Sequence, residues 1–293
     1  MLDYVEYWNK IFYLNDTFMD VMRQRNAECK YTSFMDKYFK FPPPPGPFPL
    51  LPDPYNDPYY TCDQFDNLYN AIEEINPCFN VYHINEMCPF TSTQLGEINT
   101  GDYTPPGSQI YFNRTDVKKA LHADVNSNWE QCTDVNVFGG NNGSNAGDTS
   151  PPPANSGVLQ RVIEHTNNTI IGSGDLDMIL STNGTLLAIQ NMTWNGAQGF
   201  HKFPSTPLYA PYHPEYNGGS LAGSGILGKW THERGLTFYT SQLAGHQLPG
   251  YTPGVAYRML EILLGRIDNF SSRASFTTQS GNFTSDTTII YRE

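Results

Sequence analysis

Asn168-Thr-Ile-Ile-Gly-Ser-Gly-Asp-Leu-Asp177 is the stretch of the chain that decides its fold. The β-branched residues predict a strand, and the glycines and two carboxylates after them predict a tight turn at its carboxyl end. A second strand is predicted in Gly235-Leu-Thr-Phe-Tyr-Thr-Ser-Gln-Leu-Ala-Gly-His246, which likewise ends in glycine and a titratable side chain. Asp177 and His246 are therefore expected at the ends of two strands.

Helices are predicted around these strands. Thr115 is expected to cap Asp116-Val-Lys-Lys-Ala-Leu-His122, and Ser156 to cap a helix whose apolar face begins at Val158. Thr252-Pro-Gly-Val-Ala-Tyr-Arg-Met-Leu-Glu-Ile-Leu-Leu-Gly265 has an N-cap, a proline at the first helical position and a closing glycine. Alternating helices and strands favour an α/β fold with a mostly parallel sheet and flanking helices, in which chemistry gathers beyond the carboxyl ends of the strands.

The beginning of the chain has a different character. Apolar residues recur at three- and four-residue intervals over residues 1–40, which predicts two short helices, and the same spacing resumes from Cys62 to Ile75. The proline run after Phe41 cannot donate to a strand ladder and ends the first helical section. We therefore expect a helical insertion before the α/β part.

Three parts follow from these patterns. The first is an insertion subdomain stapled by cysteines, the second carries the strands, and the third is a tail rich in Ser, Thr and Asn that is expected to have little structure. Their ranges are 1–108, 109–267 and 268–293.

The cysteines support this division. The chain has five cysteines, an odd number, so that four could pair locally and one is left over. Cys78 and Cys88 bracket a loop short enough to be closed by one disulfide. The full set is Cys29, Cys62, Cys78, Cys88 and Cys132.

Composition excludes some partners and favours a compartment. The 29 acidic and 17 basic residues give a net charge of -12 without a basic stripe, so no nucleic-acid partner is expected. No apolar stretch approaches the roughly 20 residues that a membrane span needs. Asn-x-Ser/Thr sequons favour a glycoprotein that is secreted or vacuolar/lysosome-like. They begin at Asn15, Asn113, Asn142, Asn167, Asn183, Asn191, Asn269 and Asn282.

The amino terminus does not match this destination. Met1-Leu-Asp-Tyr-Val-Glu-Tyr-Trp8 has neither the basic start nor the apolar core of a signal peptide. We therefore expect the true amino terminus, with its signal and the partner of one cysteine, to lie upstream. On this interpretation the chain is a fragment or one half of a processed enzyme.

No metal or cofactor is expected. The histidines show no HExxH spacing and the cysteines form no CxxC. Gly172-Ser-Gly-Asp175 follows its strand, but the glycine pattern and helix of a dinucleotide-binding site do not continue it. His122 is interpreted as a structural helix-end residue and His232, beside Glu233, as a surface residue.

The order of Asp177 and His246 fits nucleophilic catalysis. In α/β-hydrolases the chain order is nucleophile, acid and histidine, with the last two on turns after late strands. The histidine takes a proton from the nucleophile, and a buried carboxylate fixes its tautomer. Taken alone, a strand-end Asp is more often a loop cap. A weak nucleophile candidate is Ser220 in Gly218-Gly-Ser-Leu-Ala222, but it follows Asp177 and lacks a preceding strand.

Two segments resemble those of serine carboxypeptidases. Gly174-Asp-Leu-Asp177 is similar to their Gly-Asp-x-Asp segment, in which the second aspartate is the triad acid. Ala244-Gly-His-Gln-Leu-Pro249 is similar to the segment around their triad histidine, with Leu248 a mild departure. The helix ending at His122, with Trp129-Glu-Gln-Cys132, also fits the family's order. The resemblance covers residues 60 to 267.

The resemblance implies the C-terminal part of an α/β-hydrolase, with Asp177 as acid, His246 as base and Asp175 supporting the turn. In the family the cysteine of the Trp-x-x-Cys stretch pairs near the amino terminus, which implies that Cys132 is unpaired here. The family's Gly-Glu-Ser-Tyr-Ala-Gly elbow, its oxyanion glycines and the Asn and Glu that hold the substrate carboxylate are missing from this chain.

The implied activity is the release of C-terminal amino acids from peptides through an acyl-enzyme. The expected partners are a peptide with a free C-terminus and the missing region or chain that carries the serine. Alone, this chain is expected to be inactive. Two alternatives stay open: a carboxypeptidase-like acyltransferase, and a non-catalytic secreted glycoprotein.

Overall fold

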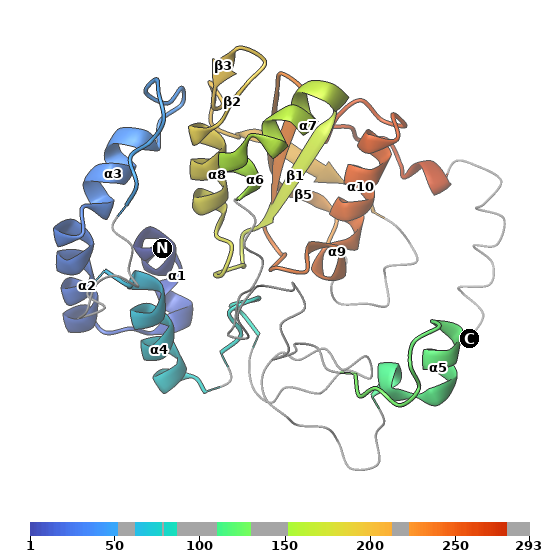
Figure 1. The fold of residues 1–293 in the computed structure, drawn as a ribbon, viewed down its shortest axis with the longest axis horizontal. Helices are drawn as coiled ribbons and strands as arrows, with labels where there is room; N and C mark the ends of the chain where they lie inside the picture. Colours follow the sequence, from blue (N-terminus) through green and yellow to red (C-terminus); the bar gives the residue numbers. More distant parts are fainter. Residues whose placement is uncertain (52–61, 78, 87–109, 130–151, 213–222, 280–293) are drawn as a thin grey trace.

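A computed structural model describes residues 1–51, 62–77, 79–86, 110–129, 152–212 and 223–279 of the chain (Figure 1). Within these residues, no helix has the length and apolar character needed to cross a membrane. The helical first part lies beside an α/β part that holds both predicted strands (Figure 1).

The first part is built from helices, of which the first three are joined by short turns. Three helices form before residue 40, one more than the sequence predicts, and α4 forms where the apolar spacing resumes. Asn15 begins the second helix by accepting the Phe18 N–H at 2.9 Å, and Lys30, at φ 64°, separates the second from the third. Their bounds are α1 Leu2–Phe12, α2 Asp16–Glu28, α3 Tyr31–Tyr38 and α4 Gln64–Ile75.

One apolar core joins this part to the acid segment. Val5 of α1, Met22 of α2 and Leu68 of α4 are fully buried together. The same cluster contains Leu176 and Met178, which flank Asp177 in the chain. The helical part therefore packs directly against the turn that carries this carboxylate.

A disulfide fastens the first part. Cys29 at the end of α2 and Cys62 before α4 are bonded, with their Cα atoms 5.6 Å apart. Both were disulfide candidates from the sequence. Cys78, Cys88 and Cys132 lie outside the described residues, so the pairing of Cys78 with Cys88 and the free thiol of Cys132 stay predictions.

Replacing both Cys29 and Cys62 by serine should destabilise the chain. The bond closes a separation of 33 residues, for which the chain-entropy model gives about 3 to 4 kcal/mol. Urea unfolding of the oxidised proteins measures this difference in free energy. Cys132→Ser is the matched control and should change it little, because this thiol is expected to be unpaired. An unchanged free energy in the double variant would contradict the role given to the bond.

The sheet is mixed, which corrects the expectation of a mostly parallel sheet. Its order is β1-β6-β5-β4. β1 pairs parallel with β6, whereas β5 pairs antiparallel with both β6 and β4. The strands are β1 Thr169–Gly174, β4 Thr206–Ala210, β5 Gly225–Glu233 and β6 Leu236–Ser241.

A tight hairpin explains the antiparallel pairing. Arg234 and Gly235 join β5 to β6 with φ angles of 52° and 83°, the positive values that a two-residue type I′ turn requires. Such a turn can only reverse the chain. A second two-residue turn, Asn195-Gly196, joins β2 Thr193–Trp194 to β3 Ala197–Gln198 in a small separate sheet.

Helices cover both faces of the main sheet (Figure 1). On one face, Ile163 and Leu186 pack against Phe238 of β6. On the other, Val255 packs against Tyr239, the next residue of β6. Neighbouring residues of a strand point to opposite faces, so β6 is buried from both sides. The covering helices are α7 Val158–Thr166, α8 Thr182–Asn191, α9 Leu248–Tyr251 and α10 Pro253–Leu263.

Several predicted helix ends need small corrections. α10 begins at Pro253 after Thr252 and is followed by Gly265 at φ 65°, as predicted. In contrast, Gly157, not Ser156, is the N-cap of α7, and α5 includes Thr115 with Arg114 as its N-cap. The remaining short helices are α5 Thr115–Ala120, α6 Pro153–Ser156, η2 Tyr111–Asn113 and η4 Thr277–Gln279.

The start of the tail is more ordered than the sequence suggests. Phe270 is fully buried against Tyr239 of β6, with ring centroids 4.7 Å apart. Phe276 is also buried, beside Tyr257 of α10. The start of the tail therefore packs on the sheet through Phe270 and on α10 through Phe276, because these two aromatic side chains supply apolar surface within a polar composition.

Candidate active site

The acid segment follows β1 and is packed tightly against the end of β6. A Cβ at Gly174 would collide with the carbonyl oxygens of Ala244 and Gly245, so only glycine lets the two loops cross here. Leu176 N–H donates to the Ala244 carbonyl at 2.9 Å. The turn after β1 is thereby tied to the loop that leads to His246.

Asp177 is held in one orientation. Its side chain is 6% exposed, and its Oδ1 accepts the N–H groups of Ile179 and Leu180 at 3.0 and 3.1 Å. These two bonds compensate for the burial of the carboxylate. They leave Oδ2 to accept from another partner.

That partner is His246. Its Nδ1 lies 3.0 Å from Asp177 Oδ2, and its backbone N–H donates to the Tyr82 carbonyl at 2.8 Å. A carboxylate accepts at this distance, so in the neutral imidazole the hydrogen sits on Nδ1 and Nε2 carries the lone pair. The His246 side chain as a whole is 38% exposed. The structure therefore brings the two predicted residues together, with the imidazole of His246 partly open to solvent.

Exposed apolar side chains occur close to the pair in the chain. Ile179 and Leu180 follow the acid and are exposed, as is Leu243 before the histidine. The Tyr82 ring lies 5.2 Å from the His246 ring and is also exposed. An apolar rim of this kind can contact a peptide or another part of a larger protein.

Asp175 has a different environment from Asp177. Its backbone N–H donates to the Ser241 carbonyl at 2.9 Å, while its side chain lies 3.5 Å from the Thr182 hydroxyl. Burial raises the pKa of the Asp175 carboxyl. Its backbone N–H supports the turn, whereas its side chain, which was predicted to do so, lines a cavity instead.

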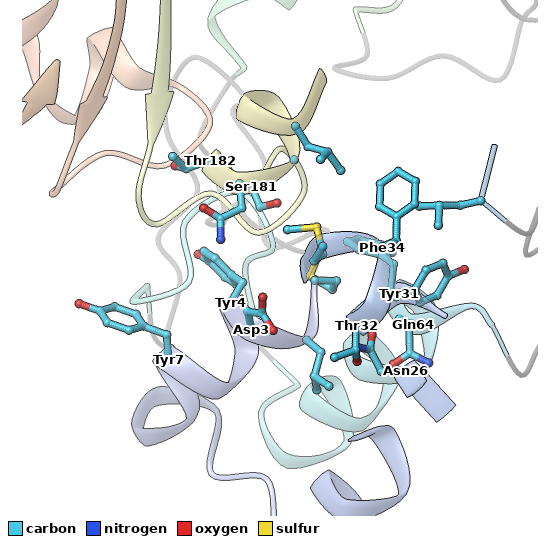
Figure 2. A pocket seen from close by; sticks show the side chains of 18 of the residues that line it. Asp3, Tyr4, Tyr7, Asn26, Tyr31, Thr32, Phe34, Gln64, Ser181 and Thr182 are labelled. Atoms are coloured by element: carbon cyan, nitrogen blue, oxygen red, sulfur yellow. The ribbon is translucent and has the colours of Figure 1, made fainter. Parts of the chain in front are cut away.

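This cavity has a volume of about 910 Å³ and lies between the helical part and α8 (Figure 2). Tyr4 of α1 extends towards Ser181 and Thr182 across it (Figure 2). Asp3, Asp36, Asp63 and Asp175 line it, and no lysine, arginine or histidine does so among the described residues. Asp177 and His246 are not part of its lining.

Two polar groups in the cavity wall are unsatisfied. Gln64 is 5% exposed, and neither atom of its amide has a hydrogen-bond partner in the described part of the chain. The Tyr4 hydroxyl is likewise unpartnered there, and burial together with Asp177 and Asp175 raises its pKa. With these groups and its carboxylates, the cavity can accept a polar or cationic group.

The predicted glycosylation sites differ in exposure and in contacts. Asn15 and Asn167 are exposed, whereas Asn183 lines the cavity and Asn191 accepts from the Phe48 N–H at 2.8 Å. Asn113 and Asn269 are partly exposed. Glycosylation stays a prediction at all of them. Asn142, Asn282 and the weak nucleophile candidate Ser220 lie outside the described residues.

Sequence reasoning missed Tyr82 and Gly245 as parts of the site. A Cβ at Gly245 would collide with the Tyr82 carbonyl oxygen, the group that accepts the His246 N–H. The available signal was the glycine directly before the histidine. A glycine in that place indicates a close backbone approach, although it does not name the approaching segment.

Comparisons with known proteins match nearly the whole chain. A family described as serine carboxypeptidase matches residues 5–266. A probable serine carboxypeptidase of Arthroderma benhamiae is 41% identical over 268 residues, which cover 92% of this chain and 48% of the relative. Serine-type carboxypeptidase F of Aspergillus niger is 42% identical over 278 residues, covering 92% and 51%. The chain thus spans about half the length of these curated relatives.

A solved structure shares the fold. A prohormone-processing carboxypeptidase from Saccharomyces cerevisiae superposes with a TM-score of 0.55 at 17% sequence identity. The match covers 92% of this chain and 52% of the solved chain. At this identity the likeness concerns the fold alone.

Proposed function

The chain belongs to the serine carboxypeptidase family, and from this premise we propose that it supplies the acid and base of a catalytic triad. The reaction is the release of a C-terminal amino acid from a peptide through an acyl-enzyme. The observation that carries the proposal is the 3.0 Å contact between Asp177 Oδ2 and His246 Nδ1 at the carboxyl ends of two adjacent parallel strands.

The proposed proton path uses the free nitrogen of His246. When a serine oxygen bonds to the scissile carbonyl carbon, its proton moves to Nε2, and Asp177 stabilises the imidazolium that results. Cleavage of the C–N bond then returns this proton to the departing amino group. Water repeats the cycle: Nε2 takes its proton as the acyl carbon is attacked, and gives it back to the serine oxygen.

The serine is proposed to come from a segment outside this chain. The family's Gly-Glu-Ser-Tyr-Ala-Gly elbow does not occur in the sequence. Among the described strands β1 is at the edge of the sheet, with β6 on its only paired side. A parallel strand added along that edge would end beside Asp177 and His246, where a serine on the following turn could reach Nε2.

The proposed location is secreted or vacuolar/lysosome-like. The Cys29–Cys62 disulfide supports an oxidising compartment, and the sequons at exposed Asn15 and Asn167 support glycosylation. Treatment of the natural protein with an endoglycosidase, followed by mass measurement, tests this part of the proposal. An unglycosylated protein would contradict it.

The isolated 293-residue chain should be inactive. Without the nucleophile a triad enzyme loses about a million-fold in rate, even when the remaining geometry is intact. We expect no turnover of N-blocked dipeptides and no adduct with a fluorophosphonate, read by intact mass. Stoichiometric labelling of this chain, at Ser220 above all, would overturn the assignment of the nucleophile to another segment.

A further inference from the structure

Residues 81–84 bind the backbone on both sides of the acid. Met178 N–H donates to the Val81 carbonyl at 3.0 Å, and Ile84 N–H donates to the Leu176 carbonyl at 3.1 Å. Two hydrogen bonds therefore flank the carboxylate, one before it and one after it. The segment comes from the first part of the chain, far from the acid in sequence.

The same segment holds the base. The Tyr82 carbonyl accepts the His246 N–H at 2.8 Å, and Gly245 lies so close that a Cβ there would be 2.8 Å from Cδ2 of the His83 ring. Residues 81–84 thus lie between the acid turn and the base loop and contact both. Any shift of this segment changes the relative position of the two catalytic groups.

His83 is the side chain at the centre of this arrangement. It is 5% exposed, and its ring stacks on Tyr251 with centroids 3.9 Å apart and planes at 19°. Its Nε2 lies 3.3 Å from the Leu243 carbonyl in the base loop. Because a carbonyl oxygen only accepts, Nε2 must carry the hydrogen.

The surroundings of the other ring nitrogen, Nδ1, fit the same tautomer. His83 Nδ1 is buried without a hydrogen-bond partner in the described part of the chain and lies 4.0 Å from Glu86 Oε1. Burial lowers the pKa of His83, which keeps the ring neutral with Nδ1 unprotonated. The Glu86 carboxylate is occupied by other donors, the Tyr251 hydroxyl at 3.1 Å and Asn80 Nδ2 at 2.6 Å.

We infer that His83 is a positioning residue for His246. Its Nε2–H donates to the Leu243 carbonyl, and this hydrogen bond holds the base loop so that the distance between His246 and Asp177 is kept. This inference rests on the proposed function, since it assigns a purpose to the geometry of the pair. A displacement of about 1 Å in a catalytic group can cost on the order of a hundred-fold in rate.

Two substitutions separate the hydrogen bond from the packing. His83→Gln places an amide N–H near the position of Nε2 and can still donate to Leu243, but cannot stack as a ring. His83→Phe retains a ring against Tyr251 and loses the donor. If His83 positions the base loop through its hydrogen bond, the glutamine variant should behave like the wild type and the phenylalanine variant should not.

The measured quantity is the rate at which the His246 Nδ1–H proton exchanges with water. It is observed by NMR on this chain with labelled histidine, and the measurement requires no enzyme activity. In His83→Phe its exchange with water should be at least about ten-fold faster, the effect of losing one buried hydrogen bond. In His83→Gln it should stay close to the wild-type rate. His232→Phe, at an exposed position on β5, is the control and should leave the signal unchanged.

A folding defect in His83→Phe would not end the test. His83→Asn places its amide nearer to Nδ1 than to Nε2, so it should not reach Leu243 and should show the same fast exchange. If the glutamine variant exchanges at the same rate as the phenylalanine or asparagine variant, His83 only fills space. That result would overturn the role of His83 but leave the proposed function standing. A wild-type chain without a hydrogen-bonded Nδ1–H on His246 would overturn the proposed pair and the role of His83 with it.

Discussion

Replacing His246 by alanine is expected to lower kcat about a million-fold in the complete enzyme. The complete enzyme here means this chain joined to the segment that carries the nucleophile. The imidazole is the group placed to take the serine proton, and its Nε2 is left free by the bond from Nδ1 to Asp177. The side chain is partly exposed, so its loss should disturb the fold little. Burst kinetics with an ester substrate measure acylation directly.

A surface histidine provides the control for this prediction. His232 on β5 contacts the Thr237 hydroxyl at 2.8 Å and lies away from the pair. His232→Ala should leave kcat within about two-fold of the wild type, as expected for a surface change. If His246→Ala retains a tenth of the wild-type acylation rate or more, His246 is not the base.

Replacing Asp177 by asparagine should lower kcat about ten-thousand-fold, the loss expected when the acid of a Ser-His-Asp triad becomes an amide. The structure gives the physical reason. The backbone N–H groups of Ile179 and Leu180 select the oxygen of the new amide, which turns its NH₂ group towards His246 Nδ1. The imidazole must then accept at Nδ1 and carry its hydrogen on Nε2, where it cannot act as a base.

Asp175→Asn is the matched control within the same segment. Its side chain lies by Thr182 and not by the imidazole, so kcat should change far less. Its folded pKa is raised, so the carboxyl group favours folding below its unfolded pKa and loses this contribution as pH rises through the folded value. The neutral amide should therefore preserve or increase stability at neutral pH. If Asp175→Asn loses most of its kcat while Asp177→Asn stays nearly wild type, the triad acid is Asp175 and not Asp177.

Local signals predicted the elements that carry the pair. The N-cap, proline and closing glycine around residues 252–265 predicted α10 closely. The strand-end glycines before Asp177 and His246 predicted two loops at one edge of the sheet, and the two side chains do meet there. Both predictions rested on residues adjacent in sequence to the feature they described.

Long-range features could not be predicted in this way. The mixed sheet depends on the Arg234-Gly235 turn, whose two-residue length becomes informative only once β5 is recognised as a strand. The contacts of residues 81–84 join three distant segments through backbone groups, which leave no pattern in side-chain chemistry. Phe270 is buried although its neighbours are polar, because one aromatic ring is enough to dock a segment.

The site of covalent labelling in the complete enzyme tests the central claim most directly. A fluorophosphonate should form one adduct, located by peptide mass mapping on a serine outside the 293 residues of this chain. The rate of its formation should fall at least about a thousand-fold in His246→Ala, since the base is needed to activate that serine. An adduct on Ser220 or another residue of this chain, or labelling that is as fast without His246, would contradict the claim that the chain supplies the acid and base but not the nucleophile.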